Sequence, residues 1–305
     1  MSVLNNLVAM PNRIAIACEY LYFLGDQGVE WEAVEKQLSP LKKVDADEVG
    51  DKPSGKSIAE DVLREMEKLK LLTILSNSAI ILSTEIRKIA PMDGDWQQAL
   101  RPILFSRLVL SEIAEQHGQS DVPDAIAWLL TQDPFNPMPW GGGTHVERII
   151  SQLGDNDQLR SVIGNNSRYQ NLLYWARYLG CAEWLGTPGV SVVIPDPSEA
   201  ISWLLPQVFY DEHELPIKVF MQRLSEICPV LEGGNARNNL EKRIGDEFHL
   251  KEHHLSRSTS LALNRLQLRG VIKIKASSDA QTWILDLGRE TPPVSYVSLV
   301  EGGGK

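Results

Sequence analysis

The sequence predicts a mainly α-helical fold in which two winged helix-turn-helix domains flank a helical middle domain. Apolar residues recur at helical spacing along most of the 305-residue chain. Three helices followed by a β-hairpin are expected near each end, over residues 10–90 and again from residue 215 onward. The expected domains are an N-terminal winged helix at 1–92, a middle domain at 93–204, a C-terminal winged helix at 205–292 and a flexible tail at 293–305.

The N-terminal domain is predicted from its helix starts and one hairpin turn. The expected elements are helices over 12–24 and 30–38, a third helix after Ser57, and strands over 71–75 and 79–82. Asn12 and Ser57 each precede apolar residues at helical spacing, and both side chains can cap a helix. Ser76-Asn77-Ser78 separates the two apolar runs, which is typical of a hairpin.

The middle domain is predicted to be helical, with one strand. Helical spacing extends over 96–115, 125–130, 146–153 and 169–185, and the apolar run at 190–194 indicates a strand. Five of the eight tryptophans lie in this part of the chain, at Trp96, Trp128, Trp140, Trp175 and Trp184. Large aromatic side chains at helical spacing are typical of a hydrophobic core.

The C-terminal domain repeats the pattern of the first. Helices are expected over 215–227, 236–248 and 257–269, with strands over 271–276 and 282–287. Pro216 suits a first helical turn, Ser256 can cap the third helix, and Gly270 ends it. The polar run 277–281 between the two strands predicts the hairpin of a wing.

Composition predicts a cytoplasmic protein. The apolar segment at 14–24 is short, contains Glu19 and precedes no small-residue cleavage site, so we do not expect a signal peptide. No run of about 18 apolar residues occurs, so no membrane span is expected. Cys18, Cys181 and Cys228 lie far apart beside apolar residues, which is typical of buried, reduced thiols.

The net charge of −10 is distributed unevenly along the chain. Residues 1–216 carry 17 basic and 30 acidic side chains, whereas residues 217–289 carry 12 basic and 8 acidic ones. Nucleic-acid affinity depends on Lys and Arg that neutralise phosphates, so the whole-chain charge argues against DNA binding but the C-terminal segment favours it.

The C-terminal helix over 256–269 is the expected DNA-recognition helix, because the second helix of a helix-turn-helix enters the major groove. Its expected core face consists of Thr259, Ala262, Leu263 and Leu266. The expected DNA contacts are Arg257, Ser258, Asn264, Arg265 and Arg269 on the helix, with Lys273 and Lys275 on the wing. Leu261 and Leu268 point elsewhere, which favours the alternative of a solvated basic face on a protein-binding domain.

The N-terminal domain has a different charge pattern. Its third helix sets Glu60, Asp61, Glu65 and Glu67 against Lys56, Arg64, Lys68 and Lys70. Four carboxylates match phosphate poorly, so this domain is expected to dimerise or to bind a protein partner.

Gly50-Asp-Lys-Pro-Ser-Gly-Lys56-Ser57 matches the phosphate-loop pattern GxxxxGK[ST]. That motif requires a buried apolar strand before the loop, but the preceding segment 44–49 is acidic and would repel a nucleotide. We therefore interpret the segment as a loop whose Ser57 caps a helix. The alternative of a nucleotide site depends on Lys56 contacting the phosphates.

Two further patterns have ordinary structural interpretations. His249 and His253 are four residues apart within an acidic and histidine-rich cluster, but the spacing supplies no third metal ligand, so no metal is expected. The glycines at 141–143 precede a helix and indicate a hinge or a cap rather than an anion site. No Ser-His-Asp or Cys-His arrangement is apparent, so neither an enzyme nor a cofactor is predicted.

Several short motifs resemble one family of bacterial accessory proteins. They are Met1-Ser-Val-Leu-Asn5, Met10-Pro-Asn-Arg-Ile14, Tyr174-Trp-Ala-Arg-Tyr-Leu-Gly180 and Val193-Ile-Pro-Asp-Pro197, together with the two flanking winged helices. The chain resembles the DpdG family of bacterial islands that place 7-deazaguanine derivatives in DNA and restrict unmodified DNA. The resemblance covers most of the chain and implies a bacterial cytoplasmic protein that works beside an ATPase or helicase. It supplies no catalytic residues.

Together these observations predict a non-catalytic DNA-binding or adaptor subunit of a bacterial DNA-modification or anti-phage defence complex. The C-terminal winged helix would contact DNA, and the acidic N-terminal part would bind protein partners or a second copy of the chain. Two alternatives stay open. One is a winged-helix transcriptional regulator, and the other is an assembly scaffold that binds only protein.

Overall fold

The computed structural model describes residues 2–39, 57–76, 78–187 and 190–300. α-Helices dominate these residues, so the predicted mainly α-helical class is confirmed. The chain divides into two compact units: the first contains Asn6–Leu104, and the second contains Ser2–Asn5 with Phe105–Lys305. The division falls within helix α5 (Trp96–Val109), and the boundary expected between 204 and 205 falls within helix α11 (Ser198–Val208).

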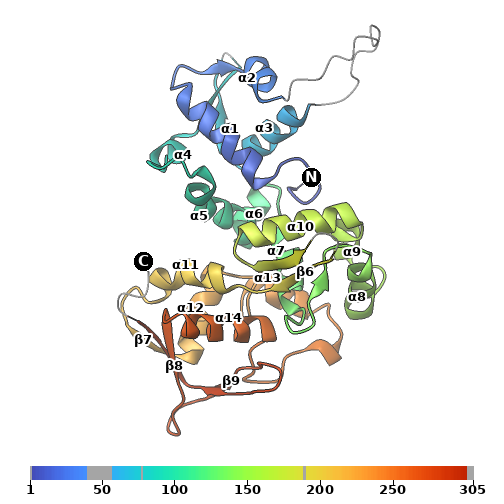
Figure 1. Cartoon of the computed structure of the whole chain (residues 1–305), viewed down its shortest axis with the longest axis vertical. Coiled ribbons are helices and arrows are strands. Elements are labelled where there is room, and N and C mark those ends of the chain that lie inside the picture. The colour runs from blue at the N-terminus through green and yellow to red at the C-terminus, as the bar shows by residue number, and fades with distance from the viewer. Residues whose placement is uncertain (1, 40–56, 77, 188–189, 301–305) are drawn as a thin grey trace. The chain divides into compact units, whose positions relative to one another are not determined.

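The first unit contains a small antiparallel sheet and the helices packed on it (Figure 1). Before α5, its elements are α1 (Pro11–Phe23), β1 (Val29–Glu30), α2 (Trp31–Leu38), α3 (Ile58–Lys68), β2 (Leu72–Ile74), β3 (Ala79–Leu82) and α4 (Thr84–Lys88). The strand order is β1-β3-β2, and β2 and β3 form the predicted hairpin. The fully buried core includes Ile14, Leu21, Val34, Leu63 and Met66.

Two helix starts in this unit test the capping predictions. Ser57 caps α3 as predicted, because its Oγ accepts a hydrogen bond from the Glu60 amide at 3.0 Å. α1 instead begins at Pro11, with Met10 at the cap position, so Asn12 is not its cap. Proline without an amide hydrogen suits the first helical turn, where that hydrogen has no partner in the helix.

The first half of the second unit is helical around a three-stranded sheet. Its elements are α6 (Ser111–Gln116), α7 (Asp121–Thr131), β4 (Met138–Pro139), α8 (Thr144–Leu153), α9 (Gln158–Ile163), α10 (Asn166–Tyr178), β5 (Ala182–Thr187), β6 (Val190–Pro195) and α11. The strand order is β4-β6-β5. The helix expected over 96–115 is broken at Leu110, and the one expected over 169–185 ends at Tyr178 because Gly180, with φ +73°, turns the chain into β5.

The N-terminal residues Ser2–Asn5 belong to this second unit. The Val3 amide donates to Gln119 Oε1 at 2.7 Å, and the Asn171 side chain donates to the Val3 carbonyl oxygen. Val3 and Leu4 are fully buried. The first residues of the chain therefore help to build the core of a unit whose other residues begin about one hundred positions later.

The second half of this unit contains β7 (Glu214–Pro216), α12 (Ile217–Ile227), α13 (Asn235–Glu241), a 3-10 turn η1 (Asp246–Phe248), α14 (Arg257–Leu268), β8 (Ile272–Lys275), β9 (Trp283–Ile284), β10 (Pro293–Val294) and β11 (Tyr296–Leu299). The helix expected over 236–248 is thus only seven residues long before the chain turns.

The strand pairing of this half differs from the sequence prediction. β8 was expected to form a hairpin with residues 282–287, but it pairs with β11, and the sheet order is β7-β11-β8. The short pair β9–β10 lies between them in the chain. Of the residues that we expected in a flexible tail, 293–294 form β10 and 296–299 form β11, the central strand of a sheet.

The two small sheets have the same connectivity. In each, a helix precedes the first strand, at least two helices follow it, and the third strand lies between the first and the second. α1, β1, α2, α3, β2 and β3 correspond in this way to α11, β7, α12, α14, β8 and β11. Within the part of the chain that the structure describes, no helix has both the length and the apolar composition to cross a membrane.

Candidate nucleic-acid interface

Helix α14 has the buried face that the sequence predicts. Thr259, Ala262, Leu263 and Leu266 are completely buried, and the helix packs on α11 and α7. Leu268 is 77% exposed, so it points away from this core as expected. Because α11 and α7 cover one side, only the opposite side of α14 and its last turn are open to solvent.

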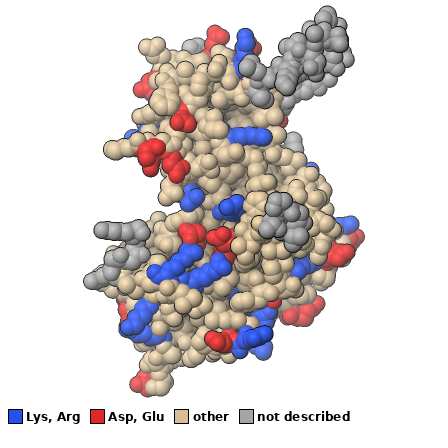
Figure 2. Space-filling model, viewed as in Figure 1, with Lys and Arg blue, Asp and Glu red and all other residues tan. Residues whose placement is uncertain are grey.

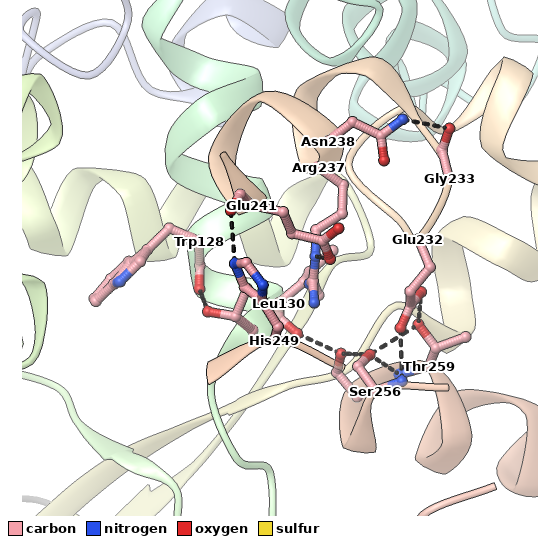
Figure 3. Close-up of polar contacts among 12 residues, drawn as sticks. Trp128, Leu130, Glu232, Gly233, Arg237, Asn238, Glu241, His249, Ser256 and Thr259 are labelled. Atoms are coloured by element: carbon pink, nitrogen blue, oxygen red, sulfur yellow. Dashed lines mark hydrogen bonds and ion pairs between the residues drawn. The ribbon is translucent and has the colours of Figure 1, made fainter. Parts of the chain in front are cut away.

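The start of α14 is fixed by a network of polar contacts (Figure 3). Ser256 Oγ accepts from the Thr259 amide at 3.3 Å and so caps the helix as predicted. Glu232 accepts from the Ser256 amide and from the Thr259 hydroxyl, each at 2.7 Å. The carboxylate is thereby placed at the positive end of the helix dipole.

The first two predicted DNA contacts take part in this anchoring. Ser258 is 1% exposed, and its hydroxyl donates to the Leu130 carbonyl oxygen of α7 at 2.6 Å. The Arg257 guanidinium forms ion pairs with Asp286 and Asp133, and these carboxylates raise its pKa further above the ordinary value. Both side chains therefore attach the start of α14 to neighbouring segments of the second unit.

The two arginines near the end of α14 face helix α11. Arg265 forms an ion pair with Asp196, whose side chain is 1% exposed, and Arg269 forms one with Glu199. Arg265 is itself half-buried, whereas Arg269 is exposed. The two ion pairs differ in their surroundings, since only the Arg265 pair reaches a buried carboxylate.

The predicted wing residues lie on β8 at the surface. Lys275 forms an ion pair with Glu214 of β7, and this contact, together with the Ser298 hydroxyl, holds the pKa of Glu214 below its ordinary value. Lys273 is exposed on the same strand, and Asn264 is half-buried on α14. Arg269, Lys273 and Lys275 are thus the most accessible of the seven predicted contacts.

The acidic partners were not found from the sequence. They are Asp133, Asp196, Glu199, Glu214 and Asp286, which lie between 29 and 124 positions from the basic residues they neutralise. On the face shown in Figure 2, Lys and Arg of the second unit form separate groups with Asp and Glu among them. The positive charge of segment 217–289 is therefore largely balanced inside the unit.

A shallow pocket of about 470 Å³ opens beside the polar network. Its lining residues are Glu232, Asn238, Glu241, Lys242, His249, Leu250, His253, His254 and Trp283. His249 follows η1 and His253 has a φ of +58°, so the two are not on one helix. Among the described residues, no three His, Cys, Asp or Glu side chains are grouped to hold a metal ion.

Of the two glycine-containing motifs, only the phosphate-loop match is partly outside the described residues. Residues 50–56 of the phosphate-loop match lie outside the described residues. Ser57, at its end, uses its hydroxyl to cap α3 and to donate to Glu35 Oε1 at 2.5 Å. Gly143 has a φ of +82° and precedes the first residue of α8, so the run 141–143 ends in a helix cap.

Comparison with known proteins establishes the family. The DpdG-like family matches residues 1–280 of the chain. No curated protein and no solved structure matches it. The chain therefore belongs to the DpdG-like family, as its motifs suggest, and this membership points to a role in a DNA-modification system.

Proposed function

We propose that this protein is a non-catalytic adaptor subunit of a bacterial DNA-modification or anti-phage defence complex, and that it contacts duplex DNA through a C-terminal winged helix. One observation carries the proposal: the sheet order β7-β11-β8 with α12 and α14, which is the connectivity expected of a winged helix. The same connectivity in the first unit supports a second winged helix there.

The proposed DNA-contacting surface consists of Asn264, Arg269, Lys273 and Lys275. Three predicted contacts are not part of this surface. Arg257 and Ser258 anchor the start of α14, and Arg265 is paired with the buried Asp196. The partners of Arg269 and Lys275 are exposed carboxylates, and exposed ion pairs contribute little to the free energy of folding. DNA phosphates can therefore replace Glu199 and Glu214 at small cost.

The first unit is the proposed site for protein partners, which include an ATPase or helicase of the same system or a second copy of the chain. The carboxylates of α3 disfavour DNA there. Ile16 and Phe23 lie on α1 with 56% and 76% of their area exposed. Such exposed apolar residues suit a protein contact. The proposed location of the assembly is the bacterial cytoplasm.

The second candidate function is a scaffold whose winged helices bind only protein. The ion pairs of α14 favour it, since they remove much of the free positive charge that DNA binding needs. A transcriptional regulator is the remaining alternative, and it would require a dimer on an inverted repeat.

The test compares duplex binding by the full chain with binding by Arg269→Ala/Lys273→Ala. Fluorescence anisotropy with a labelled duplex is measured over a range of salt concentrations. Each lost phosphate contact lowers the slope of log affinity against log salt by about 0.9, so the double variant should lose roughly two units. Lys88→Ala removes an exposed charge from α4 of the first unit and should leave the slope unchanged.

An unchanged slope in the double variant would refute this DNA surface. No duplex binding by the unmodified chain, together with capture of a protein partner, would favour the scaffold instead.

A further inference from the structure

Three aromatic side chains of the second unit form an exposed cluster, which we call the aromatic platform: Trp140, Tyr174 and Trp184. The rings of Trp140 and Trp184 are stacked, with centroids 4.7 Å apart and an angle of 20°. Tyr174 meets Trp140 edge to face at 4.9 Å. Tyr174 is 41% exposed and Trp184 is 37% exposed, so two of the three rings offer substantial area to solvent.

The fold brings these rings together from three elements. Trp184 lies on β5, opposite Val193 of β6, and Trp140 follows β4, with its amide bonded to the Ser191 carbonyl at 3.0 Å. Strand alternation places Trp140 and Trp184 on the same face of the β4-β6-β5 sheet. α10 packs on β5 and supplies Tyr174 from its outward side.

α10 also carries polar side chains on the side that bears Tyr174. Asn166, Gln170, Tyr174 and Arg177 recur at three-to-four spacing, so they lie along one side of the helix. The Asn166 and Gln170 amides lie against Gly141, where an added Cβ would come within 3.1 and 3.5 Å of them. Two amide groups therefore border the backbone next to Trp140.

One arginine gives the cluster a positive charge. Arg177 is exposed, and its guanidinium lies over the Trp184 ring, 5.5 Å from the centroid. Within the described residues this guanidinium forms no ion pair, in contrast to those of Arg257, Arg265 and Arg269 of α14.

We propose that the aromatic platform binds single-stranded DNA, by stacking unpaired bases on its rings while Arg177 contacts a phosphate. Stacked aromatic side chains beside free cations are the chemistry by which proteins hold single strands, and side-chain amides can bond to base edges. A protein partner would also use Trp, Tyr and Arg, but it would need a more continuous apolar surface. The one exposed aliphatic neighbour on β5, Leu185, alternates onto the opposite face of the sheet.

This proposal goes beyond duplex contact by α14 and β8, and the two are tested separately. The full chain is titrated against labelled oligothymidine, which cannot form a duplex, and affinity is read by fluorescence anisotropy. Trp184→Ala and Tyr174→Ala should each weaken binding about 5- to 30-fold, because each removes one stacking surface. Arg177→Ala should lower the salt slope by about 0.7, the value for one phosphate of a single strand.

Leu185→Ala is the matched control, since it truncates an exposed side chain on the next position of the same strand and should leave affinity unchanged. Circular dichroism and thermal unfolding verify that each variant is folded, and Trp184→Phe keeps a stacking ring if the alanine variant unfolds. In that case Trp184→Phe should bind oligothymidine nearly as tightly as the unmodified chain, whereas Tyr174→Ala should bind it more weakly.

The proposal is overturned if the unmodified chain does not bind oligothymidine, or if Tyr174→Ala and Trp184→Ala bind it as well as the unmodified chain does. It is also overturned if these variants lose a co-purified protein while keeping the single strand. Arg269→Ala/Lys273→Ala should retain oligothymidine binding, so a failure of duplex binding does not decide this test.

Discussion

At the scale of single residues, Asp196 links several parts of the second unit. Its side chain is 1% exposed, accepts from the Ser198 amide at 2.9 Å at the start of α11, and forms the ion pair with Arg265. Its amide also donates to the carbonyl oxygen of Cys181 at 3.2 Å. One carboxylate thus accepts from the first residue of α11 and orients an arginine of α14. A buried carboxylate with this many partners is difficult to replace.

The neighbouring Cys181 predicts a loss of stability at high pH. Complete burial, aided by the charge of Asp196, raises the pKa of its thiol to about 12 from 9.0. The unfolded chain loses this proton near pH 9, whereas the folded chain keeps it, so the free energy of unfolding should fall as pH rises above about 9. Urea unfolding at pH 7.5 and pH 10 measures this fall, which should be smaller in Cys181→Ala.

A fall in Cys181→Ala equal to that of the unmodified chain would contradict this cause. Burial also raises the pKa of Cys228, so part of the alkaline sensitivity should persist in the variant.

The predicted DNA-binding residues show where sequence reasoning fails at this scale. Helical spacing identified the buried face of α14, because that pattern is local. It gave no sign that Arg257 reaches Asp133 or that Arg265 reaches Asp196, since these partners come from distant positions. The net charge of a segment reports its composition. It does not show which of its charged side chains are already paired with carboxylates elsewhere in the chain.

At the scale of elements, strand pairing was the least predictable feature. Ser57 and Ser256 were correct predictions of helix starts because a cap depends on residues within one turn. β8 was predicted to pair with residues 282–287, but its partner is β11, which begins about twenty residues after β8 ends. Strands that follow one another in the chain usually pair with each other. Here the inserted pair β9–β10 separates β8 from its partner in the sequence.

The central position of β11 predicts that the end of the chain is needed for folding. A chain that ends at Pro292 loses the strand that pairs with both β7 and β8, and with it the buried side chain of Val297. It should unfold at a clearly lower urea concentration or fail to remain in solution. A chain that ends at Val300 keeps all three strands and should match the full chain. Equal stability of the two truncated chains would contradict this pairing.

At the scale of the whole molecule, the chain order and the structural units do not coincide. Ser2–Asn5 belong to the second unit, and the part expected as a separate middle domain shares one unit with the C-terminal helices. The contacts of α14 with α7 and α11 explain the second point, because they join residues on both sides of the expected boundary. Sequence patterns located most elements, but they could not show which elements share a core.

The position of Leu4 gives a test of this arrangement. Leu4 is fully buried and belongs to the second unit, so Leu4→Ala should lower the free energy of unfolding by about 2–4 kcal/mol. Hydrogen exchange should show the loss of protection in α7 and α10. Gln119, two residues before α7, and Asn171 of α10 bond to the backbone of Val3 and Leu4. Leu7→Ala, at a position that is 45% exposed, should cost under about 0.5 kcal/mol. A loss of protection confined to α1–α3 would contradict the assignment.

The proposed function requires that this member of the DpdG-like family contacts DNA. The most direct measurement is the affinity of the full chain for duplex DNA as a function of salt concentration. We predict binding at low salt that weakens with a log–log slope of about −2 or steeper, as expected when Arg269, Lys273 and Lys275 release counterions. No binding at about 50 mM salt, or an affinity that does not change with salt, would contradict the account.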